Sequence, residues 1–231
     1  MRRNVRYMYL ALGLSLVPAA NANAGEIMAT AMGGVFNVPV TSMKELRTAR
    51  VVMQQYDFSC GAATVATLLS FHYERPTPEY TVFKTMFDKG DQKVIRERGF
   101  SMLDMKSYLV SLGYHADGFR LKLDRLQKIG VPVITLVDIN GYKHFVVVKG
   151  MDDGRVLVGD PAFGASVMDR DYFASIWSGT ALAIRDKPQE ARKQFNQEVD
   201  WKVRPRAPIG NGVARDGISA FTRYLPSPRG F

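Results

Sequence analysis

Hydrophobic and polar residues follow a helical period in the first half of a dense core that runs from about Val51 to Arg185. Residues 61–71 are small and apolar with few charges, which predicts a helix buried on most of its surface. Ser101 begins an amphipathic helix, because its side chain can cap the N-terminus and Asp104 follows three residues later. Shorter helices are predicted around residues 80–87, 123–129 and 171–177.

From Pro132 the hydrophobic period becomes that of β-strands. Asn140-Gly141 and Asp153-Gly154 are strong signals for tight hairpin turns, so the strands that flank them should form an antiparallel meander. The predicted strands cover residues 133–138, 143–149, 155–159 and 180–184. The fold class that follows is α+β, in which a mostly buried N-terminal helix packs on an antiparallel sheet.

The second hairpin places an acid close to a histidine. If the chain turns about residues 152 and 153, Asp160 lies opposite Phe145 and next to His144. A one-residue bulge or a slightly different turn would bring His144 and Asp160 onto the same face. Opposite side chains of an antiparallel pair have Cβ atoms about 5 Å apart, which lets a carboxylate bond an imidazole N–H. The sequence thus supplies a base and an orienting acid on adjacent strands.

The N-terminus has the pattern of a secretory signal peptide over residues 1–24. Three arginines precede an apolar stretch that is followed by small residues, and we expect cleavage after Ala24, although cleavage after Ala22 also fits. The apolar stretch is shorter than the roughly 20 residues that span a bilayer. We therefore expect a periplasmic protein with no membrane span after cleavage; an uncleaved anchor is the alternative.

Three further segments are predicted in the exported chain. Residues 25–50 form an N-terminal arm with a candidate edge strand at 34–40, and residues 51–185 form the main domain. Residues 186–231 are rich in proline, glycine and arginine and form a basic C-terminal tail. Scattered aromatic residues in this tail indicate that it docks, either on its own domain or on a partner.

Composition excludes some classes of function. The net charge of +9 falls to +6 once the three signal-peptide arginines are removed, and the remaining excess is spread along the chain. This distribution favours acidic partners or anionic surfaces, but it is not the basic patch of a nucleic-acid-binding protein. One cysteine and three scattered histidines lack the spacing of a metal site, so no metal or cofactor is expected, and His72 and His115 are interpreted as structural.

Cys60 is the single cysteine of the chain and stands at the start of the helix predicted for residues 61–71. In an oxidising compartment structural cysteines are normally paired, so Cys60 is a buried inert thiol, an intermolecular link or a reactive group. A helix N-terminus and an imidazolium both stabilise a thiolate, which is the nucleophilic form. His144 can supply the imidazolium, and the side-chain amide of Gln54 or Gln55 can donate to an oxyanion.

These residues together resemble the peptidase C39 family. Gln54 lies six positions before a Cys-Gly-x-Ala motif, His144 begins a Phe-Val-Val-Val strand, and Asp160-Pro161-Ala162-Phe163-Gly164 follows sixteen residues later. Members of this family are papain-like cysteine peptidases, known chiefly as domains of bacteriocin-exporting transporters that cut leader peptides after a double glycine. The resemblance covers residues 51–185. It implies a papain-like fold with Cys60 as nucleophile, His144 as general base and acid, Asp160 as orienting carboxylate and Gln54 as oxyanion donor.

The chain also departs from many family members. Ser59 stands where an aspartate often precedes the cysteine, and a serine there can still cap the helix. No transporter domain follows, so the chain is most similar to the stand-alone, exported branch, such as the proteins encoded with Fap-type functional amyloid systems. This resemblance implies a periplasmic endopeptidase that cleaves an exported protein or leader after Gly-Gly-like residues.

The partner that the resemblance implies is an amyloid subunit or a secretion component, which is the substrate. One alternative is a peptide-binding module that keeps the fold without cutting. Another is a cell-wall amidase or acyltransferase on a related fold, which the Asp160-Pro161 motif and its interval disfavour.

Overall fold

A computed structural model of the protein describes residues 26–31, 34–39 and 41–204. The predicted signal peptide at residues 1–24 lies outside the described residues, as does the 205–231 part of the predicted tail. The chain divides into two units after Ser42, and each is described separately. Among the described residues, no helix has both the length and the apolar character needed to cross a bilayer.

The described part of the first unit forms an antiparallel hairpin. Its strands are β1 (Glu26–Ala31) and β2 (Gly34–Pro39), which pair along their whole length. The candidate edge strand at residues 34–40 therefore pairs with its neighbour in a two-stranded sheet of its own.

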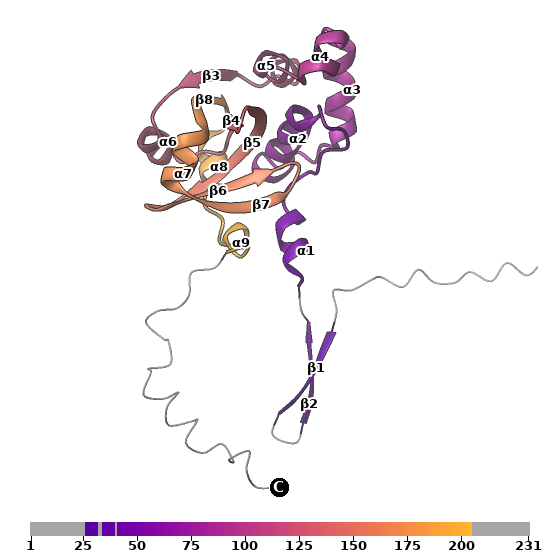
Figure 1. Ribbon diagram of the computed structural model, residues 1–231, viewed down its shortest axis with the longest axis vertical. Coiled ribbons are helices and arrows are strands. Elements are labelled where there is room, and N and C mark those ends of the chain that lie inside the picture. The colour runs from indigo at the N-terminus through magenta and orange to yellow at the C-terminus, as the bar shows by residue number, and fades with distance from the viewer. Residues whose placement is uncertain (1–25, 32–33, 40, 205–231) are drawn as a thin grey trace, which may run out of the picture. The chain divides into compact units, whose positions relative to one another are not determined.

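A six-stranded antiparallel sheet forms the frame of the second unit, with the strand order β3-β8-β4-β5-β6-β7 (Figure 1). Its strands are β3 (Ala116–Arg120), β4 (Val133–Ile139), β5 (Tyr142–Met151), β6 (Arg155–Asp160), β7 (Gly164–Asp169) and β8 (Trp177–Ile184). The predicted hairpins β4-β5 and β5-β6 are both confirmed. Asn140 and Gly141 have positive φ angles of 53° and 86°, which a two-residue turn of this hand requires.

Among the described residues, five helices precede the sheet in sequence, and four more lie between or after its strands. They are α1 (Met43–Thr48), α2 (Cys60–His72), α3 (Glu79–Lys89), α4 (Gln92–Arg98), α5 (Met102–Ser111), α6 (Leu123–Ile129), α7 (Arg170–Ile176), α8 (Pro188–Lys193) and α9 (Glu198–Trp201). The capping box predicted from Ser101 and Asp104 is present at the start of α5. Gly130 ends α6 in the left-handed conformation, as a C-terminal glycine does.

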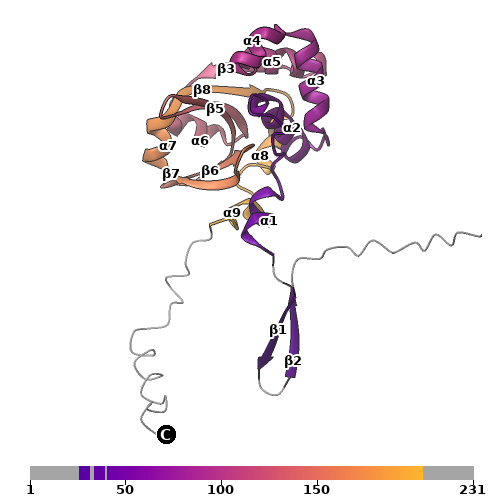
Figure 2. The same cartoon turned by 45° about the vertical axis from the view of Figure 1, so that its right-hand side comes forward.

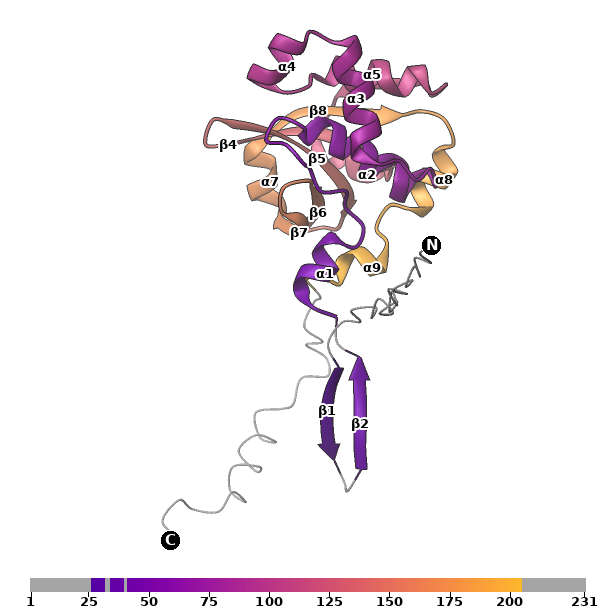
Figure 3. The same ribbon diagram turned by 90° about the vertical axis from the view of Figure 1, so that its right-hand side faces the viewer.

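Helix α2 is buried almost all round because the sheet lies on one side of it and helices lie on the other. It contacts β4, β5 and β6, and it also packs against α3 and α5. Figures 2 and 3 show α2 lying against the sheet beside β5. Its small residues allow this close approach, since Ala62, Ala63 and Ala66 are fully buried. The predicted α+β fold, with an N-terminal helix on an antiparallel sheet, is thus confirmed.

The first part of the predicted tail packs against the second unit. Phe195 and Val203 are buried, and the indole of Trp201 lies under the Arg155 guanidinium at 4.7 Å from its centroid. Residues 186–204 therefore belong to the folded unit, where they dock on the chain's own core.

Candidate active site

Cys60 is the first residue of α2 and is 8% exposed, so its thiol lies at the N-terminal end of a buried helix. Ser59 occupies the capping position but its hydroxyl makes no capping bond to α2. The Ser59 hydroxyl instead accepts from the Tyr56 N–H at 3.2 Å and donates to the Tyr56 carbonyl at 3.0 Å. The possible serine cap is therefore not formed: the Ser59 hydroxyl bonds within its own loop and gives the first turn of α2 no side-chain acceptor.

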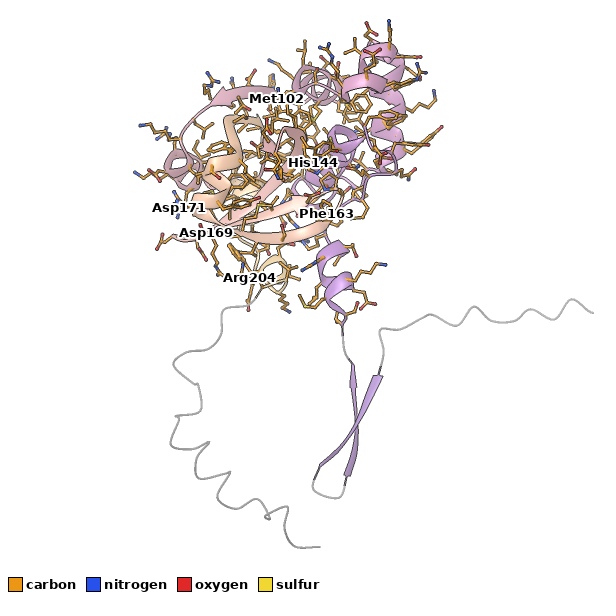
Figure 4. All side chains as sticks on the ribbon, viewed as in Figure 1. Met102, His144, Phe163, Asp169, Asp171 and Arg204 are labelled. Carbon is orange, nitrogen blue, oxygen red and sulfur yellow. The ribbon has the colours of Figure 1, made fainter. Side chains whose placement is uncertain are left out.

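His144 and Asp160 form a buried pair on neighbouring strands. The ring Nε2 of His144 lies 2.9 Å from Oδ1 of Asp160, and the two residues are 2% and 4% exposed. The same Oδ1 accepts the backbone N–H groups of Ala162, at 2.7 Å, and Phe163, at 3.2 Å. The turn after Asp160 therefore fixes the orientation of the carboxylate that contacts the imidazole. Figure 4 shows His144 in the interior of the second unit.

The pair shares a face of the sheet because of a bulge in β5. The turn alone predicts Asp160 opposite Phe145, and this register is wrong. Lys149 is an extra residue of β5 with no partner on β6, so beyond it the pairing shifts by one and ends with Val147 opposite Gly159. Carried on by one residue, this register sets Asp160 opposite Val146. Val146 and His144 point to the same face, since side chains alternate along a strand. The alternative of a one-residue bulge is thus confirmed.

The electrostatic surroundings of His144 favour its protonated form. Burial alone lowers the pKa of His144, but the hydrogen bond to Asp160 and the nearby Cys60 thiol, together with the negative charges of both groups, outweigh burial and raise this pKa to about 9. Nε2 is engaged by Asp160, and Nδ1 has no oxygen or nitrogen partner among the described residues. Nδ1 is thus the ring nitrogen available to the Cys60 thiol.

Gln54 is tied to the turn that holds Asp160. Its backbone N–H donates to the carbonyl of Pro161 at 2.9 Å, and its side-chain Nε2 donates to the Tyr56 carbonyl at 3.2 Å. Gln54 is half-buried, whereas Gln55 is exposed. Of the two candidate glutamines, Gln54 is therefore the one that the fold ties to the turn after Asp160.

Exposed aromatic side chains border the buried pair. The Tyr142 ring stacks on the His144 ring with centroids 5.8 Å apart, and the charges of Cys60, Asp57 and Asp160, together with a larger contribution from burial, raise the pKa of Tyr142. Phe163, in the turn between β6 and β7, is 78% exposed (Figure 4). In the sequence Phe163 was named only as part of the Asp160-to-Gly164 motif. An aromatic residue between a proline and a glycine in a turn could have indicated an exposed side chain at the edge of the site.

The other two histidines have different surroundings. His72 is fully buried, with Nδ1 at 3.2 Å from the Gln194 carbonyl, and burial together with the charges of Lys149 and Arg50 lowers its pKa to about 3. His72 is therefore neutral at physiological pH, so a charge interaction with the C-terminal end of α2 is excluded. The imidazole of His115 is exposed and contacts Asp186 at 2.8 Å.

Replacing Gly164 with alanine should destabilise the turn that holds Asp160. Gly164 has a φ of +82°, and an added Cβ would lie 2.8 Å from the Arg47 carbonyl oxygen. Backbone strain and this contact predict a loss of about 1–3 kcal/mol in the free energy of unfolding, measured with urea. Gly154→Ala is the matched control, because an added Cβ there meets nothing within 4 Å. Equal stabilities of the two variants would contradict the expectation.

Comparisons with known proteins converge on one family. The model of the peptidase C39 family matches residues 48–189. A protein of Pseudomonas fluorescens named "Probable functional amyloid protease FapD" is 42% identical over 175 residues, which cover 75% of this chain and 77% of that protein. The protein of the same name from Pseudomonas aeruginosa is 42% identical over 152 residues, covering 66% of this chain and 67% of the relative.

A solved structure supports the same architecture. The peptidase domain of Streptococcus ComA, a bifunctional ABC transporter involved in quorum sensing, superimposes with a TM-score of 0.51. The match covers 58% of this chain and 96% of that domain at 21% sequence identity, so it speaks for the fold alone.

Proposed function

Because the chain belongs to the peptidase C39 family of cysteine peptidases, we propose that it cleaves an exported protein or leader after small residues of the Gly-Gly type. The observation that carries this proposal is the buried His144–Asp160 hydrogen bond beside the Cys60 thiol at the start of α2. A structural histidine does not need an orienting carboxylate that is itself held by two backbone N–H groups.

Cys60 is the nucleophile in this proposal. Its thiolate is stabilised by the N-terminal end of α2, which has no side-chain cap, and by the imidazolium of His144. Attack of the sulfur on the scissile carbonyl forms a tetrahedral intermediate with a negative oxygen. The side-chain amide of Gln54 and the backbone N–H of Cys60 are the proposed donors to this oxyanion.

His144 carries the proton between the two half-reactions. Its raised pKa keeps the ring protonated near neutral pH, so it can give this proton to the leaving amine as the C–N bond breaks and the thioester forms. The neutral imidazole then takes a proton from water, which attacks the thioester and releases Cys60 and the new carboxyl terminus. Asp160 holds the ring in the orientation that both steps require.

In this proposal Tyr142, which stacks on the His144 ring, forms one wall of the substrate site and limits the room for substrate side chains next to the scissile bond. Glycine fits a narrow slot because it has no Cβ and lets the backbone approach closely.

We further propose that the substrate belongs to a functional amyloid or secretion system in the periplasm. The names of the Pseudomonas relatives support the first part of this assignment, and the signal-peptide pattern of residues 1–24 supports the second. An amyloid subunit or a secretion component is therefore the candidate partner.

Peptide cleavage by the purified exported protein tests this function. We expect a peptide that carries Gly-Gly to be cut after the second glycine, and the same peptide with Val-Val to remain intact. A haloketone built on Gly-Gly should add to Cys60, as peptide mapping by mass spectrometry would show. Intact peptides, together with labelling of Cys60 no faster than that of a model thiol, would instead favour the non-cleaving binding module.

A further inference from the structure

The bulge at Lys149 decides whether His144 can meet Asp160. Next to the turn, Gly150 pairs with Leu157, and a register continued from there would set Asp160 on the face opposite His144. The extra residue shifts the pairing by one and turns Asp160 to the face of His144. The hydrogen bond between these two residues therefore depends on Lys149 staying out of the ladder.

Asn196, which lies in the segment after β8, bonds the backbone of the residue at the bulge and of a residue two positions later. Asn196 donates its backbone N–H to the Lys149 carbonyl at 3.0 Å. The side chain of Asn196 accepts from the Met151 N–H at 2.7 Å and donates to the Met151 carbonyl at 3.0 Å. Gly150 lies between them, and a Cβ there would come within 2.3 Å of the Asn196 side-chain oxygen. Asn196 thus bonds the backbone of β5 on either side of Gly150.

The Lys149 side chain is anchored by the same segment. Its ammonium is 0% exposed and donates to Asp200 at 2.7 Å and to the Arg50 carbonyl at 2.9 Å. Asp200 also accepts from the Arg50 guanidinium at 3.1 Å. A buried ammonium keeps its place only while such partners satisfy it.

The network extends to the helix that carries Cys60. The Arg50 guanidinium donates to the carbonyl of Phe71, in the last turn of α2, at 3.0 Å. It also donates to the side chain of Gln194 at 3.3 Å, and the Gln194 carbonyl contacts the His72 ring at 3.2 Å. Residues 194–200, which we call the clasp, therefore join the strand of His144 to the helix of Cys60.

We propose that the clasp is a positioning element for the active site: it fixes the Lys149 bulge and so aligns His144 with Asp160. The clasp lies beyond the family match, which ends at residue 189, so this role extends what family membership implies. The inference rests on the proposed function, but the alignment itself can be measured without a substrate.

Two variants loosen the clasp without removing a site residue. Asn196→Gly deletes the side-chain bonds to Met151 and suits the φ of 61° at this position. Asp200→Asn removes the charge that faces Lys149 and Arg50. Asp186→Asn is the matched control, because Asp186 lies just before the clasp and pairs with His115 instead of the bulge.

The first readout is the pH titration of the His144 ring by NMR, with the three histidines assigned through His72→Gln and His115→Gln. In the native protein we expect a midpoint of about 9. In both clasp variants the midpoint should fall by about 1–2 units, because the Asp160 contact that raises it is loosened. The second readout, alkylation of Cys60 by iodoacetamide at pH 6, should slow by roughly 10-fold.

The control should match the native protein in both readouts. A merely structural clasp would lower the unfolding temperature of Asn196→Gly and Asp200→Asn while leaving the midpoint and the alkylation rate of the folded protein unchanged, and that result would overturn the proposal. Failure of the native protein to cut any peptide would instead contradict the proposed function and leave these measurements interpretable.

Discussion

Replacing Cys60 with alanine is expected to abolish peptide cleavage, with a loss in kcat on the order of 10⁶-fold. The reason is chemical, since alanine has no group that can form the thioester. Cys60→Ser should retain only a trace of activity, because a hydroxyl is a far weaker nucleophile than a thiolate. The measurement is the rate of product formation from a Gly-Gly peptide, followed by mass spectrometry.

The fold should tolerate the Cys60→Ala change, so lost activity can be separated from unfolding. Cys60 makes no disulfide, and alanine favours the start of α2 at least as well. Ser70→Ala, near the other end of the same helix, is the matched control and should cut at close to the native rate. Residual cleavage in Cys60→Ala equal to that of the native protein would rule out the proposed nucleophile.

Replacing Asp160 with asparagine should lower kcat/KM by roughly 10²–10⁴-fold while the protein stays folded. The asparagine keeps the size of the side chain and can still accept the backbone bonds from Ala162 and Phe163. It lacks the negative charge that stabilises the imidazolium, so the His144 ring loses proton affinity although the oxygen that it contacts stays in place. Asp171→Asn, an exposed site on α7, provides a control for charge removal alone.

The pH profile distinguishes this explanation from simple destabilisation. In the native protein the proton on His144 is held up to a pKa of about 9, so cleavage should decline as the pH rises through that value. Without the Asp160 charge the pKa of His144 falls, and the alkaline decline should begin at lower pH. An Asp160→Asn profile with the native midpoint would contradict the proposed role of the carboxylate.

The sequence predicted those parts of the fold that depend on local signals. Asn140-Gly141 and Asp153-Gly154 specify tight turns wherever they occur, so both hairpins were predictable. The capping box of α5 is equally local. Strands β3 and β7 were missed because their form depends on pairing with neighbours: β3 is largely exposed and begins Ala-Asp-Gly, and β7 begins at the glycine of a turn. Helix α4 was missed because it buries only Ile95.

The candidate site, too, has parts that local sequence signals predict and parts that depend on distant contacts. The adjacency of His144 and Asp160 followed from the hairpin, and their hydrogen bond confirms it, while the catalytic roles of these residues and of Cys60 and Gln54 stay predictions. The β5 bulge that brings His144 and Asp160 onto one face could be predicted only as one of two alternatives. Lys149 continues an ordinary strand pattern, and the residue that holds it, Asp200, comes 51 positions later. Such a contact leaves no trace in local periodicity.

The order of these parts along the chain has a consequence for timing. Synthesis proceeds from the N-terminus, so Cys60 leaves the ribosome long before β5 and β6, and the clasp follows later still. While residues 61–143 are being added, the chain therefore carries a thiol without its base. If the clasp completes the alignment, a chain that has not yet acquired residues 194–200 lacks an aligned His144–Asp160 pair and cannot cut neighbouring chains.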